Sequence, residues 1–134
     1  GPGFFTANMD GRGVPAAQVL RVKKDGSQAY ESLAHYDAAQ KKFVPDPIDL
    51  GPESDQVFLI LYGTGLRFRS SLSGVKVQIG GLDGSVQYAG LQGYYVGLDQ
   101  VNVLLPRTLA GKGLVDVVMT MDGKTANTVS ILIR

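Results

Sequence analysis

The segment formed by residues 57–67 constrains the fold more than any other part of the chain. It reads Val-Phe-Leu-Ile-Leu-Tyr-Gly-Thr-Gly-Leu-Arg and is the most continuously apolar run in the sequence. The run is far shorter than the roughly 20 residues that a membrane-spanning helix needs. A short run rich in β-branched and aromatic residues predicts a strand that is covered on both faces. Gly63 and Gly65 then predict a tight structural turn that ends the strand.

Length and composition point to one all-β domain. The chain has 134 residues, 18 glycines and 6 prolines, and its valine, leucine and isoleucine residues fall in short runs. This pattern favours many short strands joined by tight turns, with helix in the minority. Cysteine is absent, which excludes disulfides and thiolate metal sites. Thirteen basic and twelve acidic residues give a net charge of +1, so neither nucleic acid nor an anionic membrane is the expected partner.

The first part of the chain predicts one hairpin and one ambiguous segment. Residues 17–24 read as a strand, Asp25-Gly26 as a two-residue type I′ turn, and the chain then returns through Tyr30. Residues 31–42 fit either extended chain with a turn at residues 37–40 or about two helical turns, and we favour extended chain. Residues 43–50 contain two prolines, which suit an edge or crossing strand because proline lacks an N–H group.

The second part of the chain shows the alternation typical of strands with one buried face. Strands are expected at residues 75–79, 86–88 and 100–105, with a turn at residues 80–84 and a loop at residues 90–97. Residues 114–121 and 129–133 form the clearest hairpin, turned near Asp122-Gly123. Their inward face is expected to hold Val115, Val117, Met119, Met121, Val129, Ile131 and Ile133.

Seven or more short strands with turn signals every eight to twelve residues predict an immunoglobulin-like antiparallel β-sandwich. The tryptophan and the paired cysteines of antibody domains are both missing from the chain. The expected relationship to antibody domains is therefore one of architecture only. A single domain over residues 1–134 is expected, with Gly1 interpreted as a residue left by tag cleavage.

Several motifs also occur in an order that resembles a known family. These motifs are Leu61-Tyr62-Gly63-Thr64-Gly65, residues 75–81, Val101-Asn102-Val103-Leu104-Leu105-Pro106, Ala110-Gly111, and Asp122-Gly123 before Ala126-Asn127-Thr128. Their order is similar to immunoglobulin-like IPT/TIG domains. It more closely resembles an uncharacterised C-terminal domain family of large secreted acidobacterial proteins, over essentially the whole chain. The residues before Val57 exceed the length of the IPT/TIG pattern.

The resemblance implies a fold, an exported setting and a place behind other modules, but no activity, cofactor or catalytic residue. We expect a secreted or cell-surface protein whose preceding modules are partners of this domain. The chain does not open with a signal peptide, and we expect the sequence to begin downstream of one.

Motifs for catalysis and for nucleotides are incomplete. Gly63-Thr64-Gly65 could approach a phosphate, but neither the Gly-Lys-Ser/Thr of a P-loop nor the third glycine of a dinucleotide fingerprint follows. His35 is the only histidine, and a zinc site or a serine triad needs further partners around it. No catalytic, cofactor or metal site is predicted, and His35 is interpreted as a surface or strand residue.

Two charged groups have alternative interpretations. Asp46, Asp49, Glu53 and Asp55 form an acidic loop that could bind calcium or supply paired carboxylates, although the spacing fits no EF-hand. The basic residues Arg67 and Arg69 around Phe68, with Arg21, Lys23 and Lys24, could contact DNA. The nearly balanced net charge argues against nucleic acid, and cations on an edge strand are expected to block association of sheet edges.

Gln92, Tyr94 and Tyr95 are the predicted contact residues for a ligand or partner. Loop tyrosines with a nearby amide can stack on a sugar or anchor a protein. The alternative is a corner tyrosine that packs under the loop. Two functions are therefore open: a non-catalytic spacer or protein-interaction module without membrane insertion, and a carbohydrate-binding module that uses the loop tyrosines.

Overall fold

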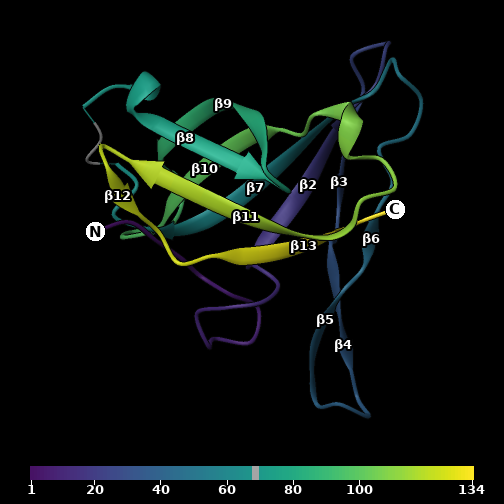
Figure 1. Cartoon of the computed structure of the whole chain (residues 1–134), viewed down its shortest axis with the longest axis horizontal. Coiled ribbons are helices and arrows are strands. Elements are labelled where there is room, and N and C mark those ends of the chain that lie inside the picture. The colour runs from purple at the N-terminus through teal and green to yellow at the C-terminus, as the bar shows by residue number, and fades with distance from the viewer. Residues whose placement is uncertain (68–69) are drawn as a thin grey trace.

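The regular secondary structure of the described residues is almost entirely β-strand (Figure 1). The computed structural model describes residues 1–67 and 70–134. In these residues the helical segments are two short 3-10 turns, η1 (Leu72–Gly74) and η2 (Arg107–Leu109). The predicted all-β class is confirmed. The strands are β1 (Gly3–Phe4), β2 (Ala17–Val22), β3 (Gln28–Glu31), β4 (Ala34–Asp37), β5 (Lys42–Pro45), β6 (Pro47–Ile48), β7 (Gln56–Thr64), β8 (Val75–Ile79), β9 (Leu82–Leu91), β10 (Asp99–Leu104), β11 (Gly113–Met121), β12 (Lys124–Thr125) and β13 (Val129–Ile133).

A single curled sheet supplies both layers of the sandwich. The first layer has the strand order β3-β2-β7-β10-β9 and the second has the order β8-β11-β13-β6. Strand β9 joins them, because its beginning pairs with β8 and its later residues pair with β10. The pairings are antiparallel except that between β13 and β6, which is parallel. The expected antiparallel sandwich therefore has one parallel edge.

Gly84 lies at the point where β9 passes from one layer to the other. A Cβ atom on Gly84 would approach Val103 Cγ1 to 2.4 Å and Ile79 Cδ1 to 2.7 Å. These two side chains come from different layers, on β10 and β8. Only glycine leaves enough room at this position for the two layers to close on each other.

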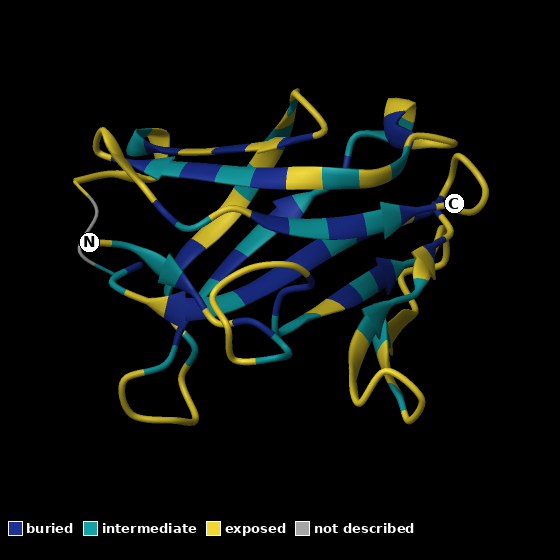
Figure 2. Ribbon diagram, turned by 60° about the horizontal axis from the view of Figure 1, so that its bottom comes forward, coloured by how far each residue is buried: buried dark blue, intermediate teal, exposed yellow. Residues whose placement is uncertain are grey.

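Strand β7 is the centre of the first layer, between β2 and β10. Its inward side chains Leu59 and Leu61 have no exposed surface, whereas Phe58 and Tyr62 on the opposite face are half-buried. Ile60, also on the outer face, is 3% exposed. The predicted strand is confirmed, but only its inner face is completely covered. Gly63, predicted to lie in the turn that ends the strand, instead belongs to β7 and pairs with Phe4 and Asp99, and the positive φ angle of the turn falls on Gly65. Figure 2 shows buried residues alternating with intermediate and exposed ones along most strands, and exposed loops around them.

The predicted hairpin at the end of the chain is confirmed. β11 pairs with β12 and then with β13, around a turn in which Asp122 and Gly123 both have positive φ angles. Such a pair of angles is the signature of a type I′ turn. The predicted inward residues are buried apart from Val115, which is partly buried and packs against the core.

Two turn predictions were wrong in detail. In the β2–β3 hairpin only Gly26 has a positive φ angle, and the Ser27 carbonyl accepts a hydrogen bond from Lys23 N–H. The connection is therefore a three-residue loop rather than a type I′ turn, which needs two positive φ angles. The predicted turn at residues 80–84 is shorter, because Gly80 and Gly81 alone make it and β9 begins at Leu82.

Residues 34–45 form a hairpin, β4–β5, that projects away from the sandwich (Figure 1). The extended interpretation is confirmed, and the turn falls at residues 38–41, one residue later than the predicted 37–40. Asn8 holds this hairpin, because its amide donates to the Phe43 carbonyl and accepts from the Phe43 N–H. The two prolines lie in β5 and β6 at sheet edges, as expected.

Candidate functional site

The predicted contact residues lie in the loop between β9 and β10. Gln92 turns its side chain back into this loop, where its Oε1 accepts hydrogen bonds from the N–H groups of Tyr94 at 2.8 Å and Tyr95 at 3.1 Å. The Gln92 N–H donates to the carbonyl of Leu98, which closes the base of the loop. Gln92 therefore positions the loop, and its side-chain amide oxygen is already hydrogen-bonded to the loop backbone.

Both loop tyrosines are exposed. Tyr94 is 90% exposed and Tyr95 is 72% exposed. Neither is the corner tyrosine that the sequence left as an alternative. A tyrosine hydroxyl bonded to the backbone is found instead at Tyr88, which is 39% exposed and donates to the Leu91 carbonyl at 2.5 Å. The three predicted residues are thus brought together, with two rings outward and one amide beneath them.

A buried carboxylate next to this loop organises the glycine turn that follows β7. Asp99 is 2% exposed, and its carboxylate accepts hydrogen bonds from the Leu66 N–H at 2.9 Å and from Arg67 Nε at 2.8 Å. Sequence reasoning missed Asp99. The sequence offers only its place directly before the alternating strand predicted at residues 100–105, because its partners Leu66 and Arg67 lie 33 and 32 residues earlier in the chain.

Two arginines of the basic group considered for DNA, Arg21 and Arg67, are engaged in ion pairs, whereas Lys23 and Lys24 are exposed. Arg67 pairs with Asp99, while Phe68 and Arg69 lie outside the described residues. Arg21 was expected to be a surface cation on an edge strand, and this was wrong. β2 lies between β3 and β7, and Arg21 shares the inward face of Val19.

Arg21 is 8% exposed and ties together three distant parts of the chain. Its guanidinium pairs with Asp55 at 3.0 Å and with Glu31 at 2.8 Å, and it donates to the carbonyls of Asp49 and Leu50. The hydrogen bonds to Glu31 raise the pKa of this guanidinium above its usual value. Such a buried cation is held because every donor has a partner.

Arg107 supports the same loop from η2. It donates to the carbonyls of Asp55, Leu50 and Gly51. Two arginines therefore fix residues 49–55, which the sequence identified as a loop. Neither contact could be found from spacing alone, because the partners are 28 to 57 residues apart in the chain.

The four loop carboxylates do not form a cluster. Asp46 lies 2.5 Å from His35 Nδ1, Asp49 pairs with Arg134 at 3.3 Å, and Asp55 is buried against Arg21. Glu53 is exposed. Within residues 1–67 and 70–134, no three histidine or acidic side chains gather as metal ligands. His35 itself is an exposed residue of β4, where its prediction placed it.

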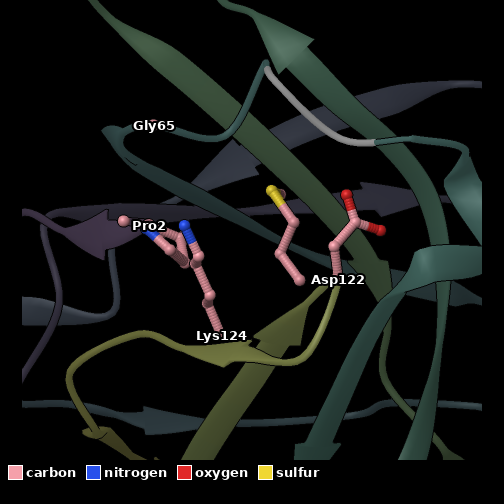
Figure 3. A pocket seen from close by; sticks show the side chains of 6 residues that line it. Pro2, Gly65, Asp122 and Lys124 are labelled. Atoms are coloured by element: carbon pink, nitrogen blue, oxygen red, sulfur yellow. The ribbon is translucent and has the colours of Figure 1, made fainter.

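A pocket of about 250 Å³ lies beside the glycine turn, between the start of the chain and the β11–β12 turn (Figure 3). Pro2 and Lys124 lie on one side of it and Asp122 on the other (Figure 3). The Asp122 carboxylate accepts hydrogen bonds from the N–H and hydroxyl groups of Ser70, both at 2.7 Å. The pocket is smaller than the roughly 300–1,000 Å³ typical of ligand sites, and its acid holds a neighbouring segment.

Comparison with protein-family models, with curated proteins and with solved structures finds no significant match. The resemblance to IPT/TIG domains and to the secreted C-terminal family stays a prediction. In the described part of the chain, no helix has the length and apolar character that a membrane span requires.

Proposed function

We propose that this chain is a non-catalytic accessory domain of an exported multidomain protein, serving as a structural spacer or as a protein-interaction and adhesion module. The observation that carries the proposal is the pairing of the buried charged side chains in the described residues. Arg21 with Asp55 and Arg67 with Asp99 hold loops to the sandwich. The buried ionic side chains therefore have structural roles. The remaining candidate residues, Tyr94 and Tyr95, offer exposed contact surface rather than reactive groups.

The finer assignment to an immunoglobulin-like domain similar to IPT/TIG domains belongs to this proposal. Its support is the arrangement of short strands in two stacked layers around one core cluster. A rigid sandwich of this kind suits a module that spaces or presents other parts of a chain.

The full-length gene product tests the setting. We expect a signal peptide and further modules before this domain, and detection of the product in the envelope fraction or the medium with an antibody to this domain. Deletion of residues 1–134 should leave the activities of the other modules unchanged and reduce surface attachment. A cytosolic product, or turnover of a chromogenic ester or glycoside by the isolated domain, would contradict the proposal.

A carbohydrate-binding function through the loop tyrosines is the second candidate. It is favoured by the exposure of Tyr94 and Tyr95 above the internal Gln92 bonds. A panel of soluble and insoluble glycans should then be bound by the parent chain and lost in Tyr94→Ala and Tyr95→Ala. Val96→Ala is the matched control, since Val96 is exposed in the same loop. Unchanged binding in both tyrosine variants would remove this candidate.

A further inference from the structure

The outward strand positions of the first layer carry no charged side chain. Cross-strand partners share a face of a sheet, so the pairs that join β3, β2, β7 and β10 place their even-numbered residues on the outer side. These positions hold only glutamine, asparagine, threonine, tyrosine and aliphatic or phenylalanine residues. Ser85, Tyr88 and Gly90 of β9 continue the same surface. We call this surface the neutral face.

The outer surface of the second layer is different. It carries Lys76 on β8 and Asp116 on β11, and both are exposed. Exposed sheets usually carry such charges, which oppose association with other molecules. The chain has 25 charged residues, yet none occupies an outward strand position on the neutral face. This separation favours an uncharged ligand there.

The polar groups of the neutral face are held in place. Tyr62 donates its hydroxyl to Gln18 Oε1 at 2.9 Å, and Gln100 Nε2 donates to Asn102 Oδ1 at 2.8 Å. Burial raises the pKa of the Tyr62 phenol, with a smaller contribution from Tyr30. Fixed amides and hydroxyls lose little conformational entropy when a ligand binds.

The end of the Tyr88 ring lies beside Gly90, in space that is open because Gly90 has no side chain. A Cβ atom on Gly90 would lie 3.0 Å from the Tyr88 hydroxyl oxygen and 3.3 Å from Cζ, so the far end of the ring occupies the space that a side chain at Gly90 would need. The hydroxyl is also bonded to the Leu91 carbonyl. The ring is therefore preorganised on the sheet and remains 39% exposed.

The aliphatic residues of the neutral face are mostly covered. Ile60 is 3% exposed and Leu104 is half-buried, whereas Tyr30 is 63% exposed. Protein interfaces depend on a desolvated apolar centre, often with arginine. The neutral face instead offers exposed tyrosine rings among amides, which is the chemistry that recognises the C–H faces and hydroxyl groups of sugars.

We propose that the neutral face binds a neutral polysaccharide chain. Tyr30 and Tyr88 stack on sugar rings, and the amides of Gln18 and Asn102 bond to hydroxyl groups. Neighbouring strands lie roughly 4.8 Å apart, so a glycan that crosses the strands meets a new row of side chains at each step. This inference rests on the proposed function of an accessory module, and it assigns the ligand to the sheet rather than to the β9–β10 loop.

Affinity electrophoresis and pull-down with cellulose, chitin, xyloglucan and galactomannan test the proposal, with alginate and polygalacturonate as charged comparisons. We expect retention by at least one neutral glycan, with an affinity that does not change between low and high salt, since no ion pair is involved. Tyr30→Ala and Tyr88→Ala should each weaken it roughly five- to tenfold, the loss of one stacked ring. Tyr88→Phe keeps the ring but loses its bond to the Leu91 carbonyl, and it should bind more tightly than Tyr88→Ala.

Circular dichroism of each variant shows that it is folded, and Tyr30→Ala alone suffices where Tyr88→Ala unfolds. No retention by any neutral glycan, or equal binding by Tyr30→Ala and the parent chain, would overturn the inference. Loss of glycan binding only in Tyr94→Ala or Tyr95→Ala would also overturn the inference, but it would leave the proposed accessory function intact. Concentration-dependent dimers abolished by Tyr30→Ala would instead assign the face to a second copy, whereas substrate turnover would reject the accessory function itself.

Discussion

Gly63 lies so close to Gly3 that a Cβ atom on Gly63 would come within 2.0 Å of the Gly3 carbonyl oxygen. The contact exists because β1 pairs with the end of β7, where Phe4 is the partner of Gly63. The β1 strand also carries a hydrogen bond from the Phe4 N–H to Asn127 Oδ1 at 2.7 Å. Because Gly63 has no side chain, strand β1 at the beginning of the chain can pair closely with the end of β7.

Gly63→Ala should displace β1 from β7 and lower the free energy of unfolding by roughly 1–3 kcal/mol, the usual cost of overpacking. Gly3→Ala is the matched control, because its Cβ atom would meet nothing closer than 3.7 Å. Urea denaturation of both variants measures the effect. Equal midpoints for the two alanine variants would contradict the assigned pairing of β1.

Gly65→Val should destabilise the chain by roughly 1–3 kcal/mol, because Gly65 has a φ angle of +71° that valine adopts only under strain. Its Cβ atom would also lie 2.6 Å from the Gly1 carbonyl oxygen. Gly123→Val separates the two causes, since Gly123 has a φ angle of +81° and no neighbour within 4 Å. The thermal midpoint of Gly65→Val should be the lower of the two, and an unchanged midpoint would refute the turn placement.

Arg21→Met should cost roughly 3–5 kcal/mol, because it leaves the buried Asp55 carboxylate without its cation. Adding Asp55→Asn to the Arg21→Met variant should restore part of the lost free energy of unfolding, because it removes the unpaired negative charge. Lys23→Met is the control on the same hairpin, where the side chain is exposed. Guanidinium unfolding of the three variants checks the order, and similar stability of Arg21→Met and Lys23→Met would show that the ion pair contributes nothing.

The β4–β5 turn should loosen in acid. The N–H and side-chain amide of Gln40, with the N–H of Ala39, donate to the Asp37 carboxylate and lower its pKa. Because the folded pKa lies below the unfolded one, the stabilisation is present above about pH 4 and is lost as the pH falls through the folded value. The amide resonance of Gln40 should follow this loss, and in Asp37→Asn the resonance should not titrate.

Periodicity was enough to identify the main strands and their inward faces. Val101 and Val103 have no exposed surface, and Met119 and Ile131 are equally buried, as their alternation predicted. Alternation reports which side chains share a face, because successive residues of a strand point to opposite sides. It does not report which strands are neighbours.

The main features that the sequence did not predict are the charged residues at inward-facing positions. Arg21 looked like a surface cation because its partner Asp55 is 34 residues away in the chain. Asp99 was missed for the same reason, since its partners on the glycine turn lie 32 and 33 residues before it. An ion pair at this sequence distance becomes visible only when the strands are placed side by side.

Local patterns in the sequence were sufficient to predict the all-β class, the central strand, the final hairpin and the loop that presents Tyr94 and Tyr95. Each follows from local rules, namely the two-residue period of strands and the φ angles that glycine permits. The three-dimensional arrangement was needed to show that β9 joins two layers, that β6 runs parallel to β13, and that the outward strand positions of the first layer carry no charge. These features depend on strand order, which arises when distant apolar faces close on one core.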